Sequence, residues 1–197
     1  MIAIIDSGGA NIASVKFALE RLGADSILTD DINTIRSAEK VLLPGVGTAP
    51  IAMQRLHDSG LVDCIQNLEQ PVLGICLGMQ LLFSCSAEGD TPLLGRFDAS
   101  CNAFTPTKQR SVPHMGWNRL NFRQEHPLIS GVDNGAHVYF VHSYFVPVTP
   151  ETVAACQYGN DFTAIVGEKN FMGCQFHPER SGPVGARILQ NFLEISS

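Results

Sequence analysis

The sequence is poor in charged residues and contains no block of like charge. Only 16% of its 197 residues are Asp, Glu, Lys or Arg, whereas about 25% is usual for a soluble protein. The 13 basic and 19 acidic residues give a net charge of −6, and no basic run or tail occurs. We therefore expect no nucleic-acid partner. Hydrophobic residues make up 45% of the chain, which argues against disorder.

Long hydrophobic runs and paired cysteines are also missing. The longest apolar run, residues 71–83, is too short and too interrupted by glycine to cross a membrane. The first residues carry no basic segment and no cleavage-like site, so we expect no signal peptide. The six cysteines form no Cys-x-x-Cys pair and lie mostly in apolar runs, which is typical of free thiols in a reducing compartment. We expect a cytoplasmic protein with no metal site and no cofactor.

The order of apolar patterns predicts an α/β fold. Strand-like runs occupy residues 2–6, 26–29, 40–43 and 71–76, and helical patterns occupy 12–22, 50–58, 61–69 and 77–83. Such alternation favours a mostly parallel central sheet flanked by helices. From residue 93 to 176 the runs are β-like and divided by turns, which indicates an antiparallel extension before a last helix that opens at Gly182-Pro183. We expect one domain over residues 1–197.

Gly74-Ile75-Cys76-Leu77-Gly78 is the most informative short motif. It places a cysteine between two small residues where an expected strand meets an expected helix, which is the pattern of a nucleophile elbow. The tight turn forces the central residue into a strained backbone, so the positions two residues away must be small. The start of the helix favours a thiolate at Cys76. The backbone N–H of Leu77 points to where an oxyanion would form.

A thiol nucleophile needs a base, and the base needs an orienting group. Phe176-His177-Pro178-Glu179 supplies both at the end of an expected strand. His177 and Glu179 are two residues apart, so both project to the same side of an extended chain. The order Cys, His, Glu is acceptable because triads are recognised by geometry. We therefore predict Cys76, His177 and Glu179 as the catalytic residues.

These two motifs resemble those of the class I, triad-type glutamine amidotransferases. Three further runs, Pro44–Gly47, Pro113–Asn118 and Tyr139–Tyr144, are similar to one branch of that family, the glutaminase subunits of imidazole glycerol phosphate synthase. The resemblance implies a flavodoxin-like fold and a part in histidine biosynthesis. It implies that L-glutamine is hydrolysed through a thioester, and that the ammonia passes to a (β/α)₈-barrel cyclase on another chain, forming a heterodimer.

The resemblance also assigns roles to residues outside the triad. It implies an oxyanion hole formed by the backbone N–H of Leu77 and one from Gly45-Val46. The implied glutamine contacts are the side chains of Gln80 and Glu88 and the backbones of Ser143, Tyr144 and Phe145. The implied interface residues are Asn11, Trp117 and Tyr139. The sequence departs from the family at Ser7 and Ala87, neither of which belongs to the triad.

Three other functions stay open at the level of sequence. The chain could be the glutaminase subunit for guanylate, anthranilate or pyridoxal phosphate synthesis, although the Trp117 motif argues against those branches. Gly8-Gly9 and Gly45–Gly47 could be anion-binding loops of a nucleotide-binding module, but neither is a full dinucleotide fingerprint and no P-loop lysine follows. A stand-alone cysteine hydrolase would be distinguished by full activity without a partner.

Overall fold

The computed structural model describes residues 1–6 and 12–196. The strands of the main sheet are β1 (Ile2–Ile5), β2 (Ser26–Thr29), β3 (Lys40–Gly45), β4 (Val72–Cys76), β9 (Asn121–Phe122), β12 (Thr152–Tyr158), β13 (Asn160–Glu168) and β14 (Phe171–Cys174). The strands of two smaller sheets are β8 (His114–Arg119) with β10 (His137–His142), and β5 (Phe83–Ser86), β6 (Thr91–Pro92), β7 (Phe97–Ala103) and β11 (Tyr144–Phe145). The helices are α1 (Ile12–Arg21), α2 (Ile32–Ser37), α3 (Ala49–Asp58), α4 (Leu61–Gln66), α5 (Leu77–Leu81) and α6 (Gly182–Glu194).

The main sheet has the strand order β2-β1-β3-β4-β14-β13-β12-β9. The first five strands in this order pair in parallel, and the last three are joined by antiparallel ladders. Four of the parallel strands, β1, β3, β4 and β14, are buried along almost their whole length, as expected when helices cover both faces of a sheet, whereas the edge strand β2 is partly exposed. The predicted α/β fold, with its parallel sheet and antiparallel extension, is therefore confirmed.

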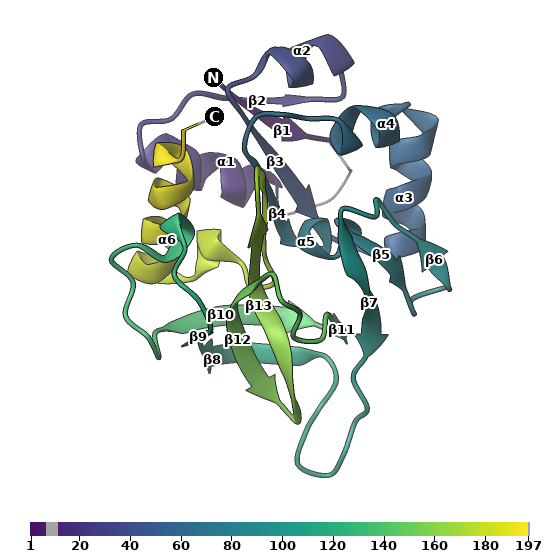
Figure 1. Ribbon diagram of the computed structural model, residues 1–197, viewed down its shortest axis with the longest axis vertical. Coiled ribbons are helices and arrows are strands. Elements are labelled where there is room, and N and C mark those ends of the chain that lie inside the picture. Colours follow the sequence, from purple (N-terminus) through teal and green to yellow (C-terminus); the bar gives the residue numbers. More distant parts are fainter. Residues whose placement is uncertain (7–11, 197) are drawn as a thin grey trace.

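The two faces of the main sheet carry separate hydrophobic cores. Helices α1 and α6 pack on one face, and α3 and α4 lie on the other (Figure 1). The α6 pattern explains its position, because Ile188, Leu189 and Phe192 recur at helical spacing and are all fully buried. The sheet of β8 and β10 adds Val138 and Phe140 to the core on the side of α1 and α6, and it lies near β12 in the lower half of Figure 1.

Three local predictions were wrong, and each has a physical reason. The helix after Cys76 ends at Leu81 rather than Phe83, because Phe83 begins β5 and pairs with β7. The helix predicted over 61–69 ends at Gln66, because Asn67 caps it and its side-chain amide donates to the Asp63 carbonyl at 2.7 Å. Helix α2 was not predicted at all, since it is only six residues long, although Asp31 caps it by accepting a 2.7 Å hydrogen bond from the Thr34 N–H.

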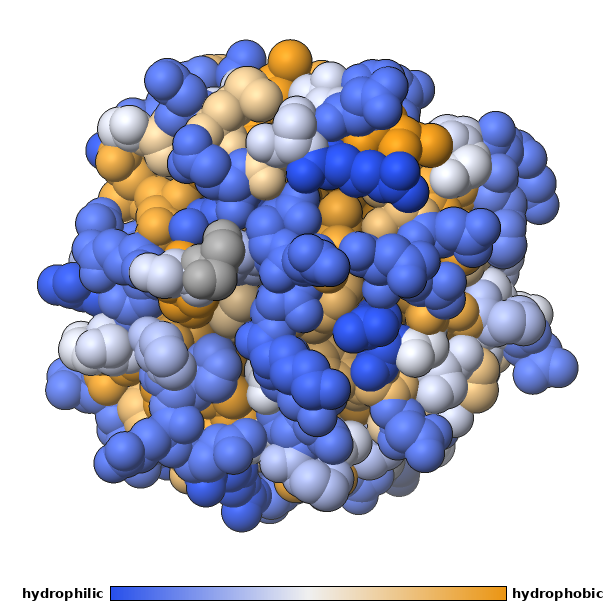
Figure 2. Space-filling model, turned by 45° about the horizontal axis from the view of Figure 1, so that its top comes forward, coloured by the Kyte–Doolittle hydropathy of each residue, from blue (hydrophilic) through white to orange (hydrophobic). Residues whose placement is uncertain are grey.

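Most of the surface is polar, with isolated hydrophobic patches. Figure 2 shows one face on which hydrophilic side chains surround smaller hydrophobic areas. The most exposed large hydrophobic side chains include Met115 and Trp117, both on β8, with exposed fractions of 62% and 56%. Within residues 1–6 and 12–196, no helix is long and apolar enough to cross a membrane.

Candidate active site

The backbone of Cys76 has the strain predicted for a nucleophile elbow. Cys76 is the last residue of β4 and directly precedes α5, with φ +55° and ψ −112°. A positive φ is uncommon outside glycine and costs of order 1–3 kcal/mol, so the surrounding structure must impose it. The turn directs the Cys76 side chain into a cavity at the carboxyl ends of β3 and β4.

Glycines make this turn possible because three backbone segments meet without side chains. A Cβ atom at Gly74 would lie 2.6 Å from the carbonyl oxygen of Gly78, and a Cβ at Gly78 would lie 1.7 Å from that of Leu43 on β3. A Cβ at Gly45 would lie 2.5 Å from the Gly78 nitrogen. The small residues predicted on either side of Cys76 are therefore required by the close approach of α5 to two strands.

His177 lies next to Cys76 because β4 and β14 are neighbours. Ile75 pairs with Cys174, so the chain leaves β14 beside Cys76 and reaches His177 three residues later. Two contacts hold the backbone there: the His177 N–H donates to the Tyr139 carbonyl at 3.0 Å, and the Ser181 hydroxyl donates to the His177 carbonyl at 2.7 Å. Ser181 is 1% exposed and was not predicted.

The imidazole of His177 lies between the thiol and a buried carboxylate. Its Nδ1–H donates to Oε1 of Glu179 at 2.8 Å, and the Glu179 side chain is 0% exposed. Burial alone would lower the His177 pKa, but hydrogen bonds and charge interactions with Cys76 and Glu179 outweigh it and raise this pKa to about 10. The geometry therefore favours an imidazolium beside the sulfur.

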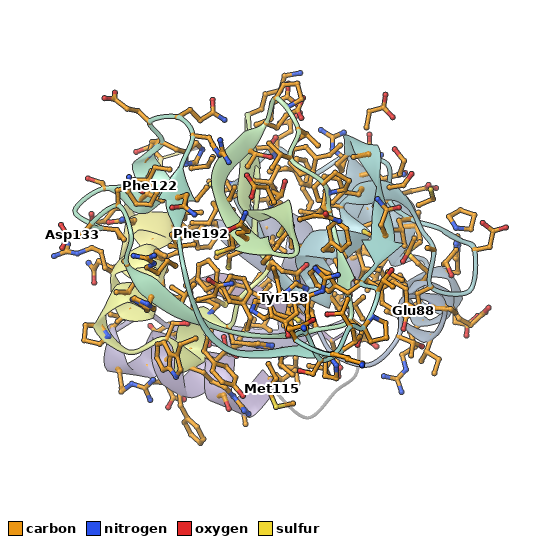
Figure 3. All side chains as sticks on the ribbon, turned by 90° about the horizontal axis from the view of Figure 1, so that it is seen from below. Glu88, Met115, Phe122, Asp133, Tyr158 and Phe192 are labelled. Atoms are coloured by element: carbon orange, nitrogen blue, oxygen red, sulfur yellow. The ribbon has the colours of Figure 1, made fainter. Side chains whose placement is uncertain are left out.

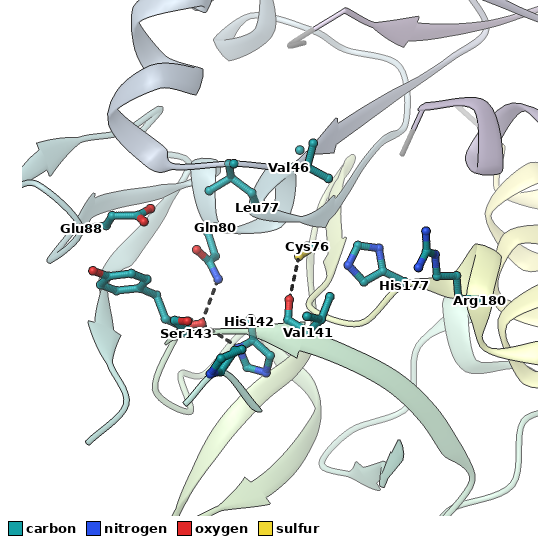
Figure 4. Close-up of a pocket in the computed structure, with 14 residues that line it drawn as sticks. Val46, Cys76, Leu77, Gln80, Glu88, Val141, His142, Ser143, His177 and Arg180 are labelled. Atoms are coloured by element: carbon teal, nitrogen blue, oxygen red, sulfur yellow. Dashed lines mark hydrogen bonds between the residues drawn. The ribbon is translucent and has the colours of Figure 1, made fainter. Parts of the chain in front are cut away.

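Cys76 and His177 border a cavity of about 460 Å³, a size suited to a small molecule, and Glu179 lies behind His177, outside the lining. The sulfur of Cys76 lies 3.7 Å from the Val141 carbonyl oxygen and 3.9 Å from Nε2 of Gln175. In Figure 4, Gln80 and Glu88 lie on the other side of Cys76 from His177. The described residues lining the cavity are Gly45, Val46, Gly47, Cys76, Leu77, Gln80, Glu88, Pro113, Val141, His142, Ser143, Tyr144, His177 and Arg180.

The segment predicted to complete an oxyanion hole lies beside the nucleophile. Gly45 pairs with Cys76 at the end of β3, and Gly45, Val46 and Leu77 all line the cavity. Gly47 has φ +97°, a conformation that suits glycine. Of the described residues, no group of three or more His, Cys, Asp and Glu side chains is placed to hold a metal ion.

Two of the residues predicted to contact the substrate also form hydrogen bonds within the protein. Gln80 is 4% exposed, and its Nε2 donates to the Tyr144 carbonyl at 2.9 Å and to Oε1 of Gln175 at 2.8 Å. Glu88 Oε2 accepts a 2.7 Å hydrogen bond from the N–H of Ala49, the first residue of α3. Glu88 therefore caps that helix from a distant loop, since Thr48 provides no side-chain cap.

The remaining predicted contacts divide into two groups. Ser143 and Tyr144 line the cavity, whereas Phe145 is not among the described lining residues. Its ring stacks on Phe104 at 4.5 Å in the hydrophobic core, so its side chain cannot contact a ligand there. Gln175, which is fully buried beside Cys76, was not predicted, because no sequence motif marks it.

An exposed aromatic pair lies on the sheet of β8 and β10. Trp117 pairs with Tyr139 across the two strands, and the ring centroids are 6.0 Å apart in an edge-to-face arrangement. Met115 is two residues before Trp117, therefore on the same face, and Figure 3 shows it at the periphery. Asn11, the third predicted interface residue, lies outside the described residues.

Comparison with known families agrees with this geometry. The family model for class-I glutamine amidotransferases matches residues 3–195, almost the whole chain. The chain belongs to the class-I glutamine amidotransferase family. The resemblance seen in its motifs is therefore confirmed at the level of the family.

Curated proteins are similar to the chain over almost their whole length. A protein of Xylella fastidiosa (strain Temecula1 / ATCC 700964) is 52% identical, with 100% of this chain and 98% of that protein covered. One of Mannheimia succiniciproducens is 51% identical, covering 97% and 98%. Both are named imidazole glycerol phosphate synthase subunit HisH.

Solved structures share the fold of this class-I glutamine amidotransferase at low identity. One from Thermoplasma acidophilum has a TM-score of 0.75 at 20% identity, covering 98% of this chain and 92% of that one. A second, described as a glutamine amidotransferase, also has a TM-score of 0.75 at 19% identity, covering 98% and 97%. At these identities the likeness supports the fold alone.

Proposed function

We propose that the chain is the glutaminase subunit of an imidazole glycerol phosphate synthase, acting in histidine biosynthesis as one amidotransferase domain over residues 1–197. It hydrolyses L-glutamine to glutamate and ammonia and passes the ammonia to a (β/α)₈-barrel cyclase subunit. The observation that carries the proposal is the chain of contacts from Cys76, which lines the cavity, through His177 to the buried Glu179. The choice of pathway rests on relatives 51–52% identical over nearly their whole length.

The reaction begins at the thiolate of Cys76. It attacks the side-chain carbonyl carbon of glutamine, and the negative oxygen that forms is stabilised by the backbone N–H of Leu77 and one from Gly45-Val46. An imidazolium at His177 then gives its proton to the amide nitrogen, the carbon–nitrogen bond breaks, and ammonia leaves a γ-glutamyl thioester on Cys76.

The second half of the reaction regenerates the enzyme. Neutral His177 takes a proton from a water molecule as the water attacks the thioester carbonyl, and glutamate leaves with the thiolate restored. Glu179 fixes the Nδ1–H tautomer of His177 through their 2.8 Å contact, so that Nε2 is the nitrogen that exchanges protons. The α-ammonium and α-carboxylate of glutamine would be oriented by the side chains of Gln80 and Glu88 and by the backbones of Ser143, Tyr144 and Phe145.

The cyclase is proposed to bind the exposed face of β8 and β10. Trp117, Tyr139 and Met115 form an apolar surface of the kind enriched in protein interfaces. Val141 is two residues after Tyr139 on β10, therefore on the same face of that strand, and it lines the cavity. This face thus continues to the site where ammonia forms. The six free cysteines are consistent with a cytoplasmic location.

The test is reconstitution with the cyclase subunit and its phosphorylated ribosyl substrate. Cys76→Ala should abolish the glutamine-dependent cyclase reaction and leave the ammonia-dependent reaction intact. Glutamine hydrolysis by the wild-type chain should rise when the cyclase and its substrate are added. Full glutaminase activity that the cyclase does not change would instead identify a stand-alone hydrolase, and stimulation by another synthetase would identify another amidotransferase.

A further inference from the structure

His142 lines the cavity and contacts a second buried histidine, His114, and neither has a part in the chemistry proposed above. His114 on β8 and His142 on β10 are 4% and 6% exposed, and Nδ1 of His114 lies 2.9 Å from Nε2 of His142. Burial lowers the pKa of His114 to about 4, and it lowers that of His142 to about 3. Both rings are therefore neutral at physiological pH.

The hydrogen bonds around the pair permit one arrangement of protons. Nδ1 of His142 lies 2.7 Å from the Tyr144 carbonyl, which can only accept, so His142 carries its proton on Nδ1. Its Nε2 must then accept, and His114 donates to it from Nδ1. Nε2 of His114 is left as an acceptor, and the Asn118 side-chain amide nitrogen lies 3.3 Å from it as a donor.

The pair ends on a peptide group in the wall of the cavity. The Tyr144 carbonyl accepts from His142 and from Gln80 Nε2, at 2.7 and 2.9 Å, so both of its lone pairs are used. One residue earlier, the Ser143 carbonyl accepts from the Phe104 N–H at 3.0 Å. Two consecutive peptide planes are thereby fixed, and Ser143 and Tyr144 both line the cavity.

We propose that His142 and His114 are positioning residues for the substrate, a proton-ordered pair that orients the peptide groups at 143–145 toward glutamine. The inference rests on the proposed function, in which those backbone groups bind the charged ends of glutamine. The pair contacts no reacting atom. It determines how precisely the substrate is held before attack, and this is the contribution that preorganised contacts make to an enzyme.

Aromatic rings confine both imidazoles and keep them from turning. His114 is stacked between Tyr158 and Phe140, with centroid distances of 4.0 and 5.0 Å. His142 meets Phe104 and Phe162 at 5.2 and 5.1 Å. In Figure 4 the His142 ring lies close to Ser143, with a dashed hydrogen bond to the backbone there. A ring flip would place a carbon where the carbonyl now accepts a proton.

The pair can be tested with substitutions that keep one nitrogen position or the other. In His142→Asn the amide nitrogen takes the place of Nδ1 and can still donate to Tyr144. In His142→Gln the amide lies at the position of Nε2, and the donor to Tyr144 is lost. The KM for L-glutamine in the complex with the cyclase should rise roughly tenfold in the Gln variant, less in the Asn variant, with kcat changed by less than about twofold in both.

The same comparison of Asn and Gln variants can be made at His114, which contacts His142 and does not line the cavity. His114→Asn keeps a donor to His142, whereas His114→Gln does not, so the Gln variant should again have the higher KM. His57→Gln, on the exposed face of α3, is the control and should match wild type. Equal KM values within each pair of folded variants, or a fall in kcat with KM unchanged, would overturn the proposal.

An independent measurement does not depend on activity. Nitrogen-15 NMR of histidine-labelled wild type at pH 7 should show two neutral histidines in the Nδ1–H tautomer, with slowly exchanging ring protons. Either histidine in the Nε2–H tautomer, or charged, would overturn the proton order. If the tautomers are as expected but wild type with cyclase never hydrolyses glutamine, the proposed function fails, and with it the role in positioning glutamine.

Discussion

Replacing His177 with Gln should change how folding stability depends on pH. Burial disfavours the charged ring, but Cys76 and Glu179 outweigh it and raise the His177 pKa to about 10 from an unfolded value of 6.5. A raised pKa stabilises the fold when the group is protonated. The contribution is therefore fully present below pH 6.5 and is lost as pH rises toward 10.

The size of the effect follows from the two pKa values. Between pH 6.5 and 8.5 the free energy of unfolding of wild type should fall by roughly 2 kcal/mol relative to His177→Gln, at 1.36 kcal/mol per pKa unit. This window avoids the ionisation of buried thiols at higher pH. Urea unfolding at pH 6.5, 7.5 and 8.5 measures the difference, with His57→Gln as control. If the free energy of unfolding depends on pH in the same way for wild type and His177→Gln, the ion pair between His177 and Glu179 is refuted.

Three further outcomes are expected. Cys76→Ser should lower glutamine hydrolysis by more than about 100-fold, and a glutamine-mimicking electrophile should label Cys76 alone among the six cysteines in peptide maps. Gly78→Ala should lower the free energy of unfolding by about 1–3 kcal/mol or more, because its Cβ would lie 1.7 Å from the Leu43 carbonyl oxygen. Glu88→Gln should raise the KM for glutamine and keep the α3 cap, whereas Glu88→Ala should also lower the melting temperature.

Each of these outcomes can be contradicted. Labelling spread over all cysteines would contradict the assignment of Cys76 as the nucleophile. An unchanged urea midpoint for Gly78→Ala would mean that α5 can move away from β3. If Glu88→Gln and Glu88→Ala melt at the same temperature, the contact with the Ala49 N–H does not stabilise the helix.

The sequence predicted the parts of the site that short motifs determine. The glycines on either side of Cys76 allow α5 to pack closely against the strands, and this requirement can be inferred from five consecutive residues. His177 and Glu179 are likewise neighbours in the chain, and their 2.8 Å contact needs only a two-residue spacing. The alternation of strands and helices predicted a mostly parallel sheet flanked by helices for the same reason, since it depends on local periodicity.

Contacts between distant segments could not be predicted in the same way. Gln175 looks like one more residue of a buried strand, and only the pairing of β14 with β4 brings it to Cys76. His114 and His142 are 28 residues apart and meet because β8 and β10 pair in register. The short helix α5 ended early because strand pairing at Phe83 outweighed its helical pattern.

The pairing of β4 with β14 has a consequence for how the enzyme fails. Cys76 and His177 follow neighbouring strands in the middle of an eight-stranded sheet, so their separation is governed by the backbone hydrogen bonds between those strands. Central strands are commonly the last to exchange their amide protons, and loops open far more often. Partial opening of the surface loops would leave the two residues in place, so the selective labelling of Cys76 by a glutamine-mimicking electrophile should be lost on heating together with the cooperative melting of the whole molecule rather than before it.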